Sequence, residues 1–205
     1  MPRPDVRLPL LDAAERLFAE RGIATVSDRQ VADAAGNSNH SAVRYYFGGR
    51  SGLMEALLDR HHAAVEPAQR RMFEESDSLL GDLRALVIPV TETFAALPTP
   101  SWRARFLRQA MTDPATAELV RERSREFPTA TAIVASAARR LAHLDPAVVE
   151  GRTRLTVHLV GSACAEIEER AQASGEPARW AEAGTFLCDA VGGLLQAPVT
   201  ATPGP

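Results

Sequence analysis

The sequence SDRQVADAAGNSNHSAVRYYFGGRSGL, residues 27–53, decides the fold. It predicts a helix, a tight turn, a second short helix and a glycine hinge that leads into a third helix. Ser27 is a favourable N-cap, and Gln30 three residues later can return a hydrogen bond to it, as in a capping box. Gly36 is a typical residue at a helix end. The stretch therefore predicts a helix-turn-helix.

The second helix of this motif is expected to present polar side chains to the outside. Ser38 can cap it, and Val43 and Phe47, four residues apart, would face inward together. The side chains left near the outer surface are Asn39, His40, Ser41, Arg44, Tyr45 and Tyr46. A short helix with polar hydrogen-bonding groups, an arginine and two tyrosines suits the major groove of double-stranded DNA.

We therefore predict DNA contacts from this surface and from arginines beside it. The predicted contacts are Arg29, Ser38, Asn39, His40, Ser41, Arg44, Tyr45, Tyr46 and Arg50. Arg50 opens the next helix, where free backbone amides favour a phosphate. Arg44, Asn39 and His40 are the candidates for contacts to base edges. The alternative interpretation is that the arginines are solvated and the tyrosines belong to the core.

Four segments, AERLFAERG at residues 14–22, QVADAAG, SAVRYYF and GGRSGL, closely resemble the DNA-binding domain of TetR-type transcriptional regulators. The resemblance covers the first quarter of the chain in one collinear block. It implies a homodimer that binds a near-palindromic operator through two recognition helices. It also implies a ligand among the later helices that changes the spacing of the recognition helices. The function implied by the resemblance is that of a ligand-responsive transcriptional regulator, which is expected to act as a repressor.

The sequence departs from the family pattern at four positions. Asn37 is polar where a small aliphatic residue is usual, and Gly49 stands where a capping serine is frequent. Arg50 replaces the usual lysine. Arg44 stands where an aromatic residue or an asparagine is common, so the operator of a relative cannot be transferred to this chain.

The overall charge of the chain gives no sign of nucleic-acid binding. Its 205 residues are enough for one large domain or for a small domain plus a larger one. They carry a net charge of −3, and 45% of them are hydrophobic, which is an ordinary globular composition. DNA binding must then come from a local patch. Across residues 27–50, three arginines against two aspartates give a net charge of +1. So modest a charge predicts few phosphate contacts per subunit and favours a dimer.

The hydropathy of the chain predicts a cytoplasmic protein. No apolar run approaches the roughly 18 residues that a membrane span needs, and Asp5, Arg7 and Asp12 interrupt any signal-peptide core. Cys164 and Cys188 form no CxxC pair. We expect two buried, reduced thiols, and a redox switch is the alternative.

The remaining sequence predicts only helices, because no period-two alternation is sustained anywhere. We expect an all-α fold of about nine helices. After the first three, the expected helices are residues 50–75, 79–97, 102–111, 114–144, 145–174 and 177–196. Pro67 predicts a kink in its helix or a break that starts a new helix, and Pro89 predicts a bend. Pro128 predicts an interruption of the 114–144 helix.

The helices are expected to form two domains. We predict a helix-turn-helix DNA-binding domain at residues 1–50, a helical ligand-binding and dimerisation domain at 51–197, and a disordered tail at 198–205. In the last two helices, small residues such as Gly161 and Gly192 alternate with large apolar ones. Two such helices from each subunit could form a four-helix bundle, while packing inside one subunit is the alternative.

A pocket for a small hydrophobic effector is expected among the helices spanning residues 79–170. The predicted ligand-binding residues are Phe94, Trp102, Arg105, Phe106, Gln109 and His158. Apolar walls with a few placed polar groups are typical of small-molecule sites. Arg105 or His158 would hold an acidic or hydrogen-bonding end of the ligand. The alternative is that these aromatic residues fill a dry core.

We predict no catalytic residues, no metal and no cofactor. His40 and Ser41 are adjacent, but the sequence identifies no carboxylate to orient them and contains no GxSxG motif. His61 and His62, near Asp59, are consecutive and so lack the i, i+4 spacing that chelation on a helix prefers. The alternatives that stay open are a regulator without an effector, a helical enzyme and a structural adaptor.

Overall fold

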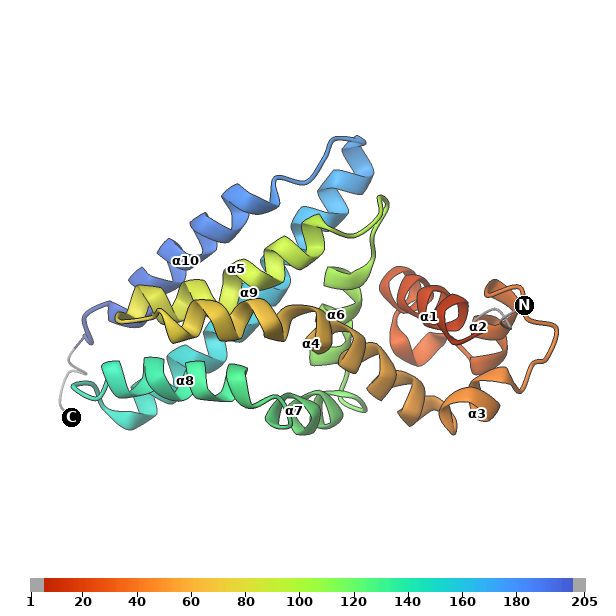
Figure 1. Ribbon diagram of the computed structural model, residues 1–205, viewed down its shortest axis with the longest axis horizontal. Helices are drawn as coiled ribbons and strands as arrows, with labels where there is room; N and C mark the ends of the chain where they lie inside the picture. The colour runs from red at the N-terminus through yellow and green to blue at the C-terminus, as the bar shows by residue number, and fades with distance from the viewer. Residues whose placement is uncertain (1–5, 201–205) are drawn as a thin grey trace.

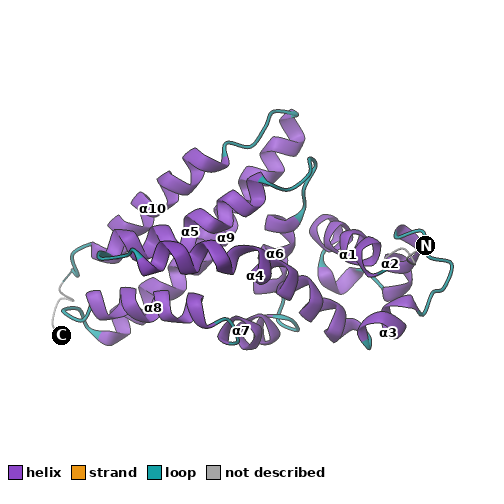
Figure 2. Cartoon of the chain, in the orientation of Figure 1, coloured by secondary structure: helices purple, strands orange, loops and turns teal. Residues whose placement is uncertain are grey.

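Every regular element in residues 6–200, the part of the chain that the computed structural model describes, is a helix (Figure 2). The predicted all-α fold is therefore confirmed. This range holds ten α-helices and one short 3-10 helix. They are α1 (Arg7–Arg21), η1 (Ile23–Thr25), α2 (Asp28–Ala34), α3 (Ala42–Phe47), α4 (Arg50–Glu74), α5 (Leu79–Ala95), α6 (Arg103–Thr112), α7 (Ala117–Arg125), α8 (Pro128–Arg140), α9 (Pro146–Ser174) and α10 (Trp180–Gln196).

The helix beyond the expected nine arises at Pro128. We predicted one interrupted helix over residues 114–144, but two separate helices form there, α7 and α8. Proline lacks an amide hydrogen and fits best in the first turn of a helix, and Pro128 accordingly begins α8. Pro67 and Pro89, in contrast, lie inside α4 and α5, which stay continuous.

The predicted tail at residues 198–205 lies only partly within the described range. Residues 198–200 have no regular secondary structure, and residues 201–205 lie outside the described residues, as do residues 1–5. The last helix begins at Trp180, three residues later than we predicted.

Two consecutive glycines turn the chain between α3 and α4. Gly48 has φ 78° and Gly49 has φ 118°, both in the left-handed region that other residues rarely adopt. Gly52 permits a close approach nearby, because a Cβ at this position would lie 1.8 Å from the carbonyl oxygen of Phe47. The glycines of this segment therefore determine how α3 meets α4.

The long helix α4 connects the two halves of the molecule (Figure 1). The helices α1, α2 and α3 surround its first turns, and α5 and α8 pack against its later part. The helix α10 packs along α5, and α6 packs against both α1 and α9. In this view, α1 and the end of α10 lie on opposite sides of the molecule. Both α4 and α6 therefore join the N-terminal helices to the rest.

The N-terminal hydrophobic core extends past residue 50, where we predicted a domain boundary. Leu53, Met54 and Leu57 of α4 pack into this core, as do Phe106 and Ala110 of α6. A second core is built from α5, α6, α9 and α10. Because α6 contributes to both cores, packing is continuous across the predicted boundary. The division into two domains therefore stays a prediction about function.

A buried polar network crosses from α1 to α4 and α6. Glu15 of α1 accepts a hydrogen bond from Nε of Arg103 of α6 at 3.0 Å and also pairs with Arg60 of α4. Arg60 donates a second hydrogen bond to Asp12 at 2.5 Å. The side chains of Arg103 and Glu15 are only 7% and 10% exposed. Charged pairs therefore tie these three helices together in addition to the apolar contacts.

Glu168 of α9 caps the first turn of α6. Its carboxylate accepts hydrogen bonds from the backbone amides of Ala104 at 3.2 Å and Arg105 at 3.0 Å, and from the Ser101 hydroxyl at 2.8 Å. Nε of Arg105 donates to the same carboxylate at 3.2 Å. A negative charge is favourable at a helix N-terminus. Glu168 therefore fixes the start of α6 against α9.

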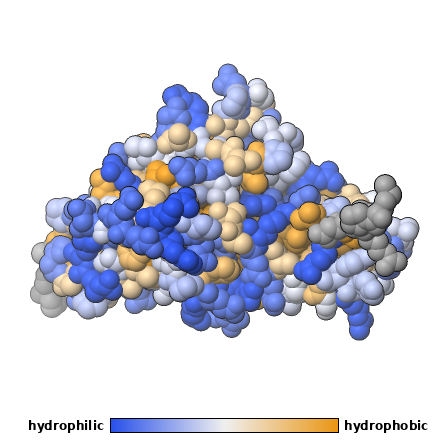
Figure 3. Space-filling view, viewed as in Figure 1, coloured by the Kyte–Doolittle hydropathy of each residue, from blue (hydrophilic) through white to orange (hydrophobic). Residues whose placement is uncertain are grey.

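The face of the molecule seen in Figure 3 is mostly hydrophilic, and apolar side chains form small separate groups on it. Within residues 6–200, no helix combines the length and the apolar character that crossing a membrane requires.

Cys164 and Cys188 are buried and free, as we predicted from the sequence. Burial raises the pKa of the Cys164 thiol to about 12 and that of Cys188 to about 11. Both groups are therefore protonated thiols at neutral pH, which makes them poor nucleophiles.

Candidate nucleic-acid interface and internal cavity

The predicted capping box forms at the start of α2. The Ser27 hydroxyl accepts a hydrogen bond from the Gln30 amide at 3.3 Å, and the Ser27 amide donates to the Gln30 side-chain oxygen at 2.8 Å. Val31 and Ala32 on the opposite side of α2 are fully buried. The cap and the buried face together fix the first helix of the motif.

Two asparagines build the turn that follows α2, and the predicted Ser38 cap does not form. Oδ1 of Asn37 accepts a hydrogen bond from the Asn39 amide at 2.9 Å, and Oδ1 of Asn39 accepts one from the Ser41 amide at 3.0 Å. Such local bonds are the usual reason for asparagine in turns. The polar residue at position 37, a departure from the family pattern, thus has a structural role. The residues that lie in this exposed turn, before α3 begins, are Ser38, Asn39, His40 and Ser41.

The short helix α3 presents Arg44 and Tyr45 to solvent. Both side chains are exposed, Tyr45 to 77%. Val43 is fully buried and Phe47 packs half-buried against the N-terminal core, as predicted for the inward side. Tyr46 is half-buried against the same core, and its ring meets that of Tyr45 edge-on at 4.9 Å. Of the two tyrosines, Tyr45 is therefore the one open to a partner.

Asp33 of α2 holds two of the predicted contact residues on the surface. Its carboxylate lies 3.0 Å from Nδ1 of His40 and 3.8 Å from Nε of Arg29. All three side chains are at least half exposed. Exposed pairs of this kind contribute only about 0–1 kcal/mol. Either side chain can therefore exchange Asp33 for a DNA phosphate at little cost.

Arg50 points into the protein, which argues against the phosphate contact that we predicted for it. Its guanidinium lies over the ring of Phe18, 4.2 Å from the centroid. It donates hydrogen bonds to Asp28 at 3.3 Å and to the carbonyl of Ile23. Burial lowers the pKa of Arg50, and the charge of Asp28 offsets part of this effect. In this structure, Arg50 ties the first turn of α4 to the helices on either side of it.

A cavity of about 240 Å³, partly open to the surface, lies among the helices α4 to α9. Side chains from all six of these helices line it, and most of them are aliphatic. Among the described residues that line it, none is an aspartate, glutamate, lysine or arginine. A mainly apolar cavity with a few polar groups is the usual form of a small-molecule site. The cavity is therefore the candidate effector site.

Only Phe94 of the six predicted ligand-binding residues lines this cavity. Phe106 belongs to the N-terminal core, where its ring lies 6.1 Å from that of Phe18. Trp102 is partly buried against the same core. These two aromatic residues therefore join α6 to α1, and their prediction as pocket residues is corrected.

The three polar residues predicted for the pocket also lie elsewhere. Arg105 is held by Glu168 and Gln172 at the N-terminal end of α6. Gln109 is half-buried outside the lining, and His158 is exposed. The sequence pattern did not reveal which side of each helix faces the cavity.

The two consecutive histidines of α4 are the residues that the pocket prediction missed. His61 and His62 both line the cavity, and the His61 ring stacks with that of Phe94 at 5.9 Å between centroids. His61 lies between Leu58 and Val65 on the buried side of α4. A polar residue at a helical spacing within an apolar stripe was the signal that could have identified it.

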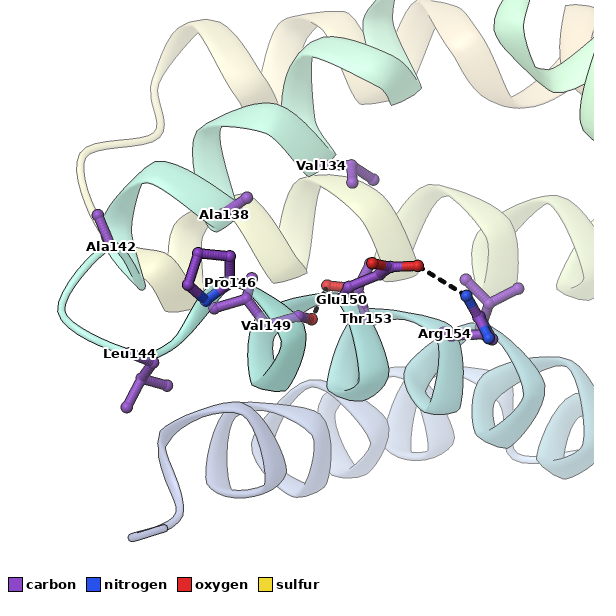
Figure 4. Close-up of a pocket in the computed structure, with 10 residues that line it drawn as sticks. Val134, Ala138, Ala142, Leu144, Pro146, Val149, Glu150, Thr153 and Arg154 are labelled. Carbon is purple, nitrogen blue, oxygen red and sulfur yellow. Dashed lines mark hydrogen bonds and ion pairs between the residues drawn. The ribbon is translucent and has the colours of Figure 1, made fainter.

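A second hollow, of about 610 Å³, is open to solvent between α8 and α9 (Figure 4). Val134 and Ala138 line it from α8, and Val149 lines it from α9. Glu150 and Arg154 form an ion pair of 2.7 Å beside it. Its openness and the charged pair make it a poorer small-molecule site than the cavity among α4 to α9.

The helices α9 and α10 each carry an exposed apolar stripe. Leu155 and Leu159 of α9 are 51% and 37% exposed, and Phe186 of α10 is 69% exposed. Ala190 and Gly193 are also exposed and continue the stripe of Phe186 along α10. Large apolar side chains that stay exposed in one subunit are typical of surfaces that another subunit covers.

The glycines that we predicted at the subunit interface face the interior instead. A Cβ on Gly161 would lie 2.4 Å from the end of the Met111 side chain in α6. Gly192 is buried, and a Cβ there would lie 3.7 Å from Leu83 of α5. Both glycines therefore serve packing within the subunit, and Gly193 is the small residue on the outer side of α10.

Comparison with known proteins bears on the N-terminal part of the chain. The family model of the bacterial regulatory proteins of the tetR family matches residues 10–57. The probable HTH-type transcriptional regulator ArpR of Pseudomonas putida is 33% identical over 88 residues, which are 42% of this chain and 41% of ArpR. The HTH-type transcriptional regulator TtgR, also of Pseudomonas putida, is 31% identical over 87 residues, with the same shares. The chain thus matches about two fifths of the length of these curated relatives.

Solved structures share the fold over nearly the whole chain. A TetR-like transcriptional regulator from Rhodococcus sp. RHA1 is similar with a TM-score of 0.62 and 18% identity, over 97% of this chain and 100% of the other. The TetR-like regulator LfrR from Mycobacterium smegmatis, in complex with proflavine, is similar with a TM-score of 0.55 and 20% identity, over 97% and 99%. The chain therefore shares its N-terminal motif with the bacterial regulatory proteins of the tetR family, and its fold with these two TetR-like regulators.

Proposed function

We propose that the protein is a transcriptional regulator that binds double-stranded operator DNA as a homodimer and acts as a repressor until a small molecule releases it. The observation that carries the proposal is a TetR-type motif whose α3 leaves Arg44 and Tyr45 exposed. The curated relatives that match this motif are transcriptional regulators by name. Catalysis is no part of the proposal.

The proposed DNA contacts come from α3 and from the turn before it. Arg44 reaches a base edge in the major groove, because it is exposed on the outer side of α3. Tyr45 contacts the sugar–phosphate backbone beside it. Arg29 can contact a phosphate from α2. The turn contributes further hydrogen-bonding groups from Ser38, Asn39, His40 and Ser41.

A ligand in the cavity would act on the same helices that hold the DNA-binding motif. On α4, Arg60 pairs with Asp12 and Glu15 of α1, and the next residue, His61, lines the cavity. On α6, Arg103 pairs with Glu15 while other residues of the helix line the cavity. The proflavine complex of LfrR, a protein of similar fold, supports a small-molecule effector. A shift of α4 or α6 would change the spacing of the two α3 helices in a dimer.

The first test is binding to an inverted repeat from the DNA upstream of the gene. The full chain is expected to shift this fragment more strongly than scrambled DNA, and the affinity should fall as salt rises because phosphate contacts release counterions. Arg44→Ala is expected to relax the preference at one position of each half-site by about 1–3 kcal/mol, because a base contact is lost. Gel shifts with single-base operator variants measure this preference.

Arg170→Ala is the matched control for the loss of an exposed arginine, since Arg170 lies on α9, far along the chain from the motif. It should leave both affinity and preference unchanged. Equal affinity of the wild type for operator and scrambled DNA would contradict the proposed function. If Arg44→Ala keeps the wild-type preference among the single-base operator variants, only the role assigned to Arg44 is contradicted.

The proposed dimer uses the exposed stripes of α9 and α10. Leu155, Leu159 and Phe186 would be covered by the same stripes of a second copy, which would form a four-helix bundle. Gly193 lies on this outer side, and a Cβ there would meet nothing within 4 Å in the subunit itself. A large side chain at this position can therefore obstruct a partner without disturbing the monomer.

Gly193→Arg is expected to convert the dimer into a folded monomer, because the new side chain would keep α9 and α10 of one copy apart from those of the other. Light scattering gives the mass, and circular dichroism checks that the helices remain. Ala64→Arg is the control, since Ala64 is exposed on α4, away from both stripes. A Gly193→Arg variant that keeps the mass of a dimer would move the interface elsewhere.

A further inference from the structure

One polar side chain in the wall of this cavity is buried and has a ring nitrogen without a hydrogen-bond partner. Of the other polar residues of its wall, His62 is only partly buried and stacks on Phe127 at 4.1 Å between ring centroids, and three donate to backbone carbonyls of helices. Gln69 donates to Leu86 at 3.2 Å, Ser124 donates to Val120 at 2.7 Å, and Thr156 donates to Arg152 at 2.9 Å. Within the described residues, the Nδ1 atom of His61 is buried without a hydrogen-bond partner.

The His61 ring is held by neighbouring rings although its Nδ1 atom is unpaired. The residue is 8% exposed, and its ring stacks with Phe94 at 5.9 Å and lies 5.6 Å from the ring of His62. A buried polar group that stays unpaired normally destabilises a protein, so such groups are rare and often functional. The position of the ring in the wall of the cavity offers a simple explanation: its partner is a ligand.

His61 is neutral in this environment. Burial lowers its pKa to about 3, and the charges of His62 and Arg103 act in the same direction. A neutral imidazole has one donor and one acceptor nitrogen, so it can bind a hydroxyl, an amide or a carbonyl.

The charged side chains that act on the cavity residues His61, His62 and Cys164 are all paired with other protein groups, including Arg123 with Asp59 and Glu66 with Arg70. Arg103, which acts on His61, is bonded to Glu15, and Glu168, which acts on Cys164, is bonded to Arg105. A charged ligand would thus enter without a partner for its charge. Burying an unpaired charge in an apolar cavity is strongly unfavourable.

We infer that the cavity selects an uncharged, largely apolar molecule with one hydrogen-bonding group, and that His61 recognises this group. The inference rests on the proposed ligand response and specifies the ligand class, without the acidic end expected from the sequence. At about 240 Å³, the cavity lies below the roughly 300–1,000 Å³ typical of drug-sized ligands, so the ligand is small.

Four probes of nearly equal shape test this specificity in the full chain. They are 1-naphthol, which is neutral with a hydroxyl, naphthalene, which has no polar group, 1-naphthoate, an anion, and 1-naphthylmethylammonium, a cation. We expect the melting temperature to rise with naphthol, and calorimetry to give a dissociation constant about 5- to 10-fold lower than for naphthalene, the worth of one net hydrogen bond. The two ions should show no binding at the same concentrations.

His61→Phe should remove the preference for naphthol over naphthalene while keeping naphthalene binding, because the new ring fills the same space without a polar group. His61→Gln should retain part of the preference. His143→Phe is the control, since His143 is exposed in the turn after α8, outside the cavity lining, and it should behave as the wild type. Circular dichroism checks that each variant is folded.

Tight binding of either ion, an unchanged naphthol preference in His61→Phe, or binding of none of the four probes would overturn the inference. Gel shifts on the same preparations separate this outcome from a failure of the proposed function. Operator binding without the expected probe preference refutes only the ligand class. Probe binding as expected in a protein without sequence-specific DNA binding refutes only the proposed function.

Discussion

Replacing Glu168 by alanine is expected to lower the free energy of unfolding by about 3–5 kcal/mol, the usual cost of removing one partner from a buried ion pair. The carboxylate is 3% exposed, and it accepts hydrogen bonds from two backbone amides of α6, from Ser101 and from Arg105. Without it, the amides of Ala104 and Arg105 and a guanidinium that is only 11% exposed lose their common partner. Urea unfolding followed by circular dichroism measures the change.

Glu169→Ala is the matched control for this measurement. Glu169 is the next residue of α9 but is exposed, so its loss should change stability by less than about 0.5 kcal/mol. A Glu168→Ala variant as stable as Glu169→Ala would mean that the cap on α6 contributes little, and that the apolar contacts of Phe106 and Ala104 alone position this helix.

Most of the fold was predictable because the signals that start and end its helices are local in sequence. Ser27 and Gln30 form their cap within four residues, and the glycines at 48 and 49 turn the chain without help from distant groups. Pro128 shows the limit of such reasoning. A proline can bend a helix or begin one, and only the packing around α7 and α8 decided that it begins one here.

The outward surface of the motif was predicted better than the orientation of its long side chains. Burial of Val43 and exposure of Arg44 and Tyr45 follow from the helical period. Arg50 was misjudged because its partners, the ring of Phe18 and the carboxylate of Asp28, come together only in the folded protein. A helix N-terminus favours an anion, but it does not determine where an arginine beside it will point.

The predicted pocket residues and the cavity lie among the same helices, but most of the predicted residues do not line the cavity. Trp102 and Phe106 looked like pocket residues because aromatic residues are large and clustered there. They were needed instead to join α6 to the N-terminal core, a contact that no local pattern reveals. His61 was visible as a polar residue in an apolar stripe. What the sequence could not reveal is that, within residues 6–200, its Nδ1 atom would be buried without a partner.

The buried histidine also predicts how stability depends on pH. His61 has an ordinary pKa near 6.5 in the unfolded chain, and burial lowers it to about 3 in the folded protein. Between these values the unfolded state binds the proton and the folded state does not, so acid favours unfolding. The contribution of this pKa difference to the free energy of unfolding is fully present above pH 6.5 and is lost as the pH falls toward 3.

Comparing the wild type with His61→Phe isolates this effect, because all other titrating groups are common to both proteins. On lowering the pH from 7.5 to 4.5, the wild type should lose about 2–3 kcal/mol more unfolding free energy than the variant, since each pKa unit between the states is worth about 1.4 kcal/mol. Urea unfolding at both pH values gives the four free energies. His143→Phe removes an exposed histidine and should lose as much stability as the wild type. Equal losses of unfolding free energy in the wild type and in His61→Phe would mean that His61 takes up a proton in the folded protein or has a partner that this structure does not provide. Either result would refute the availability of His61 to a ligand.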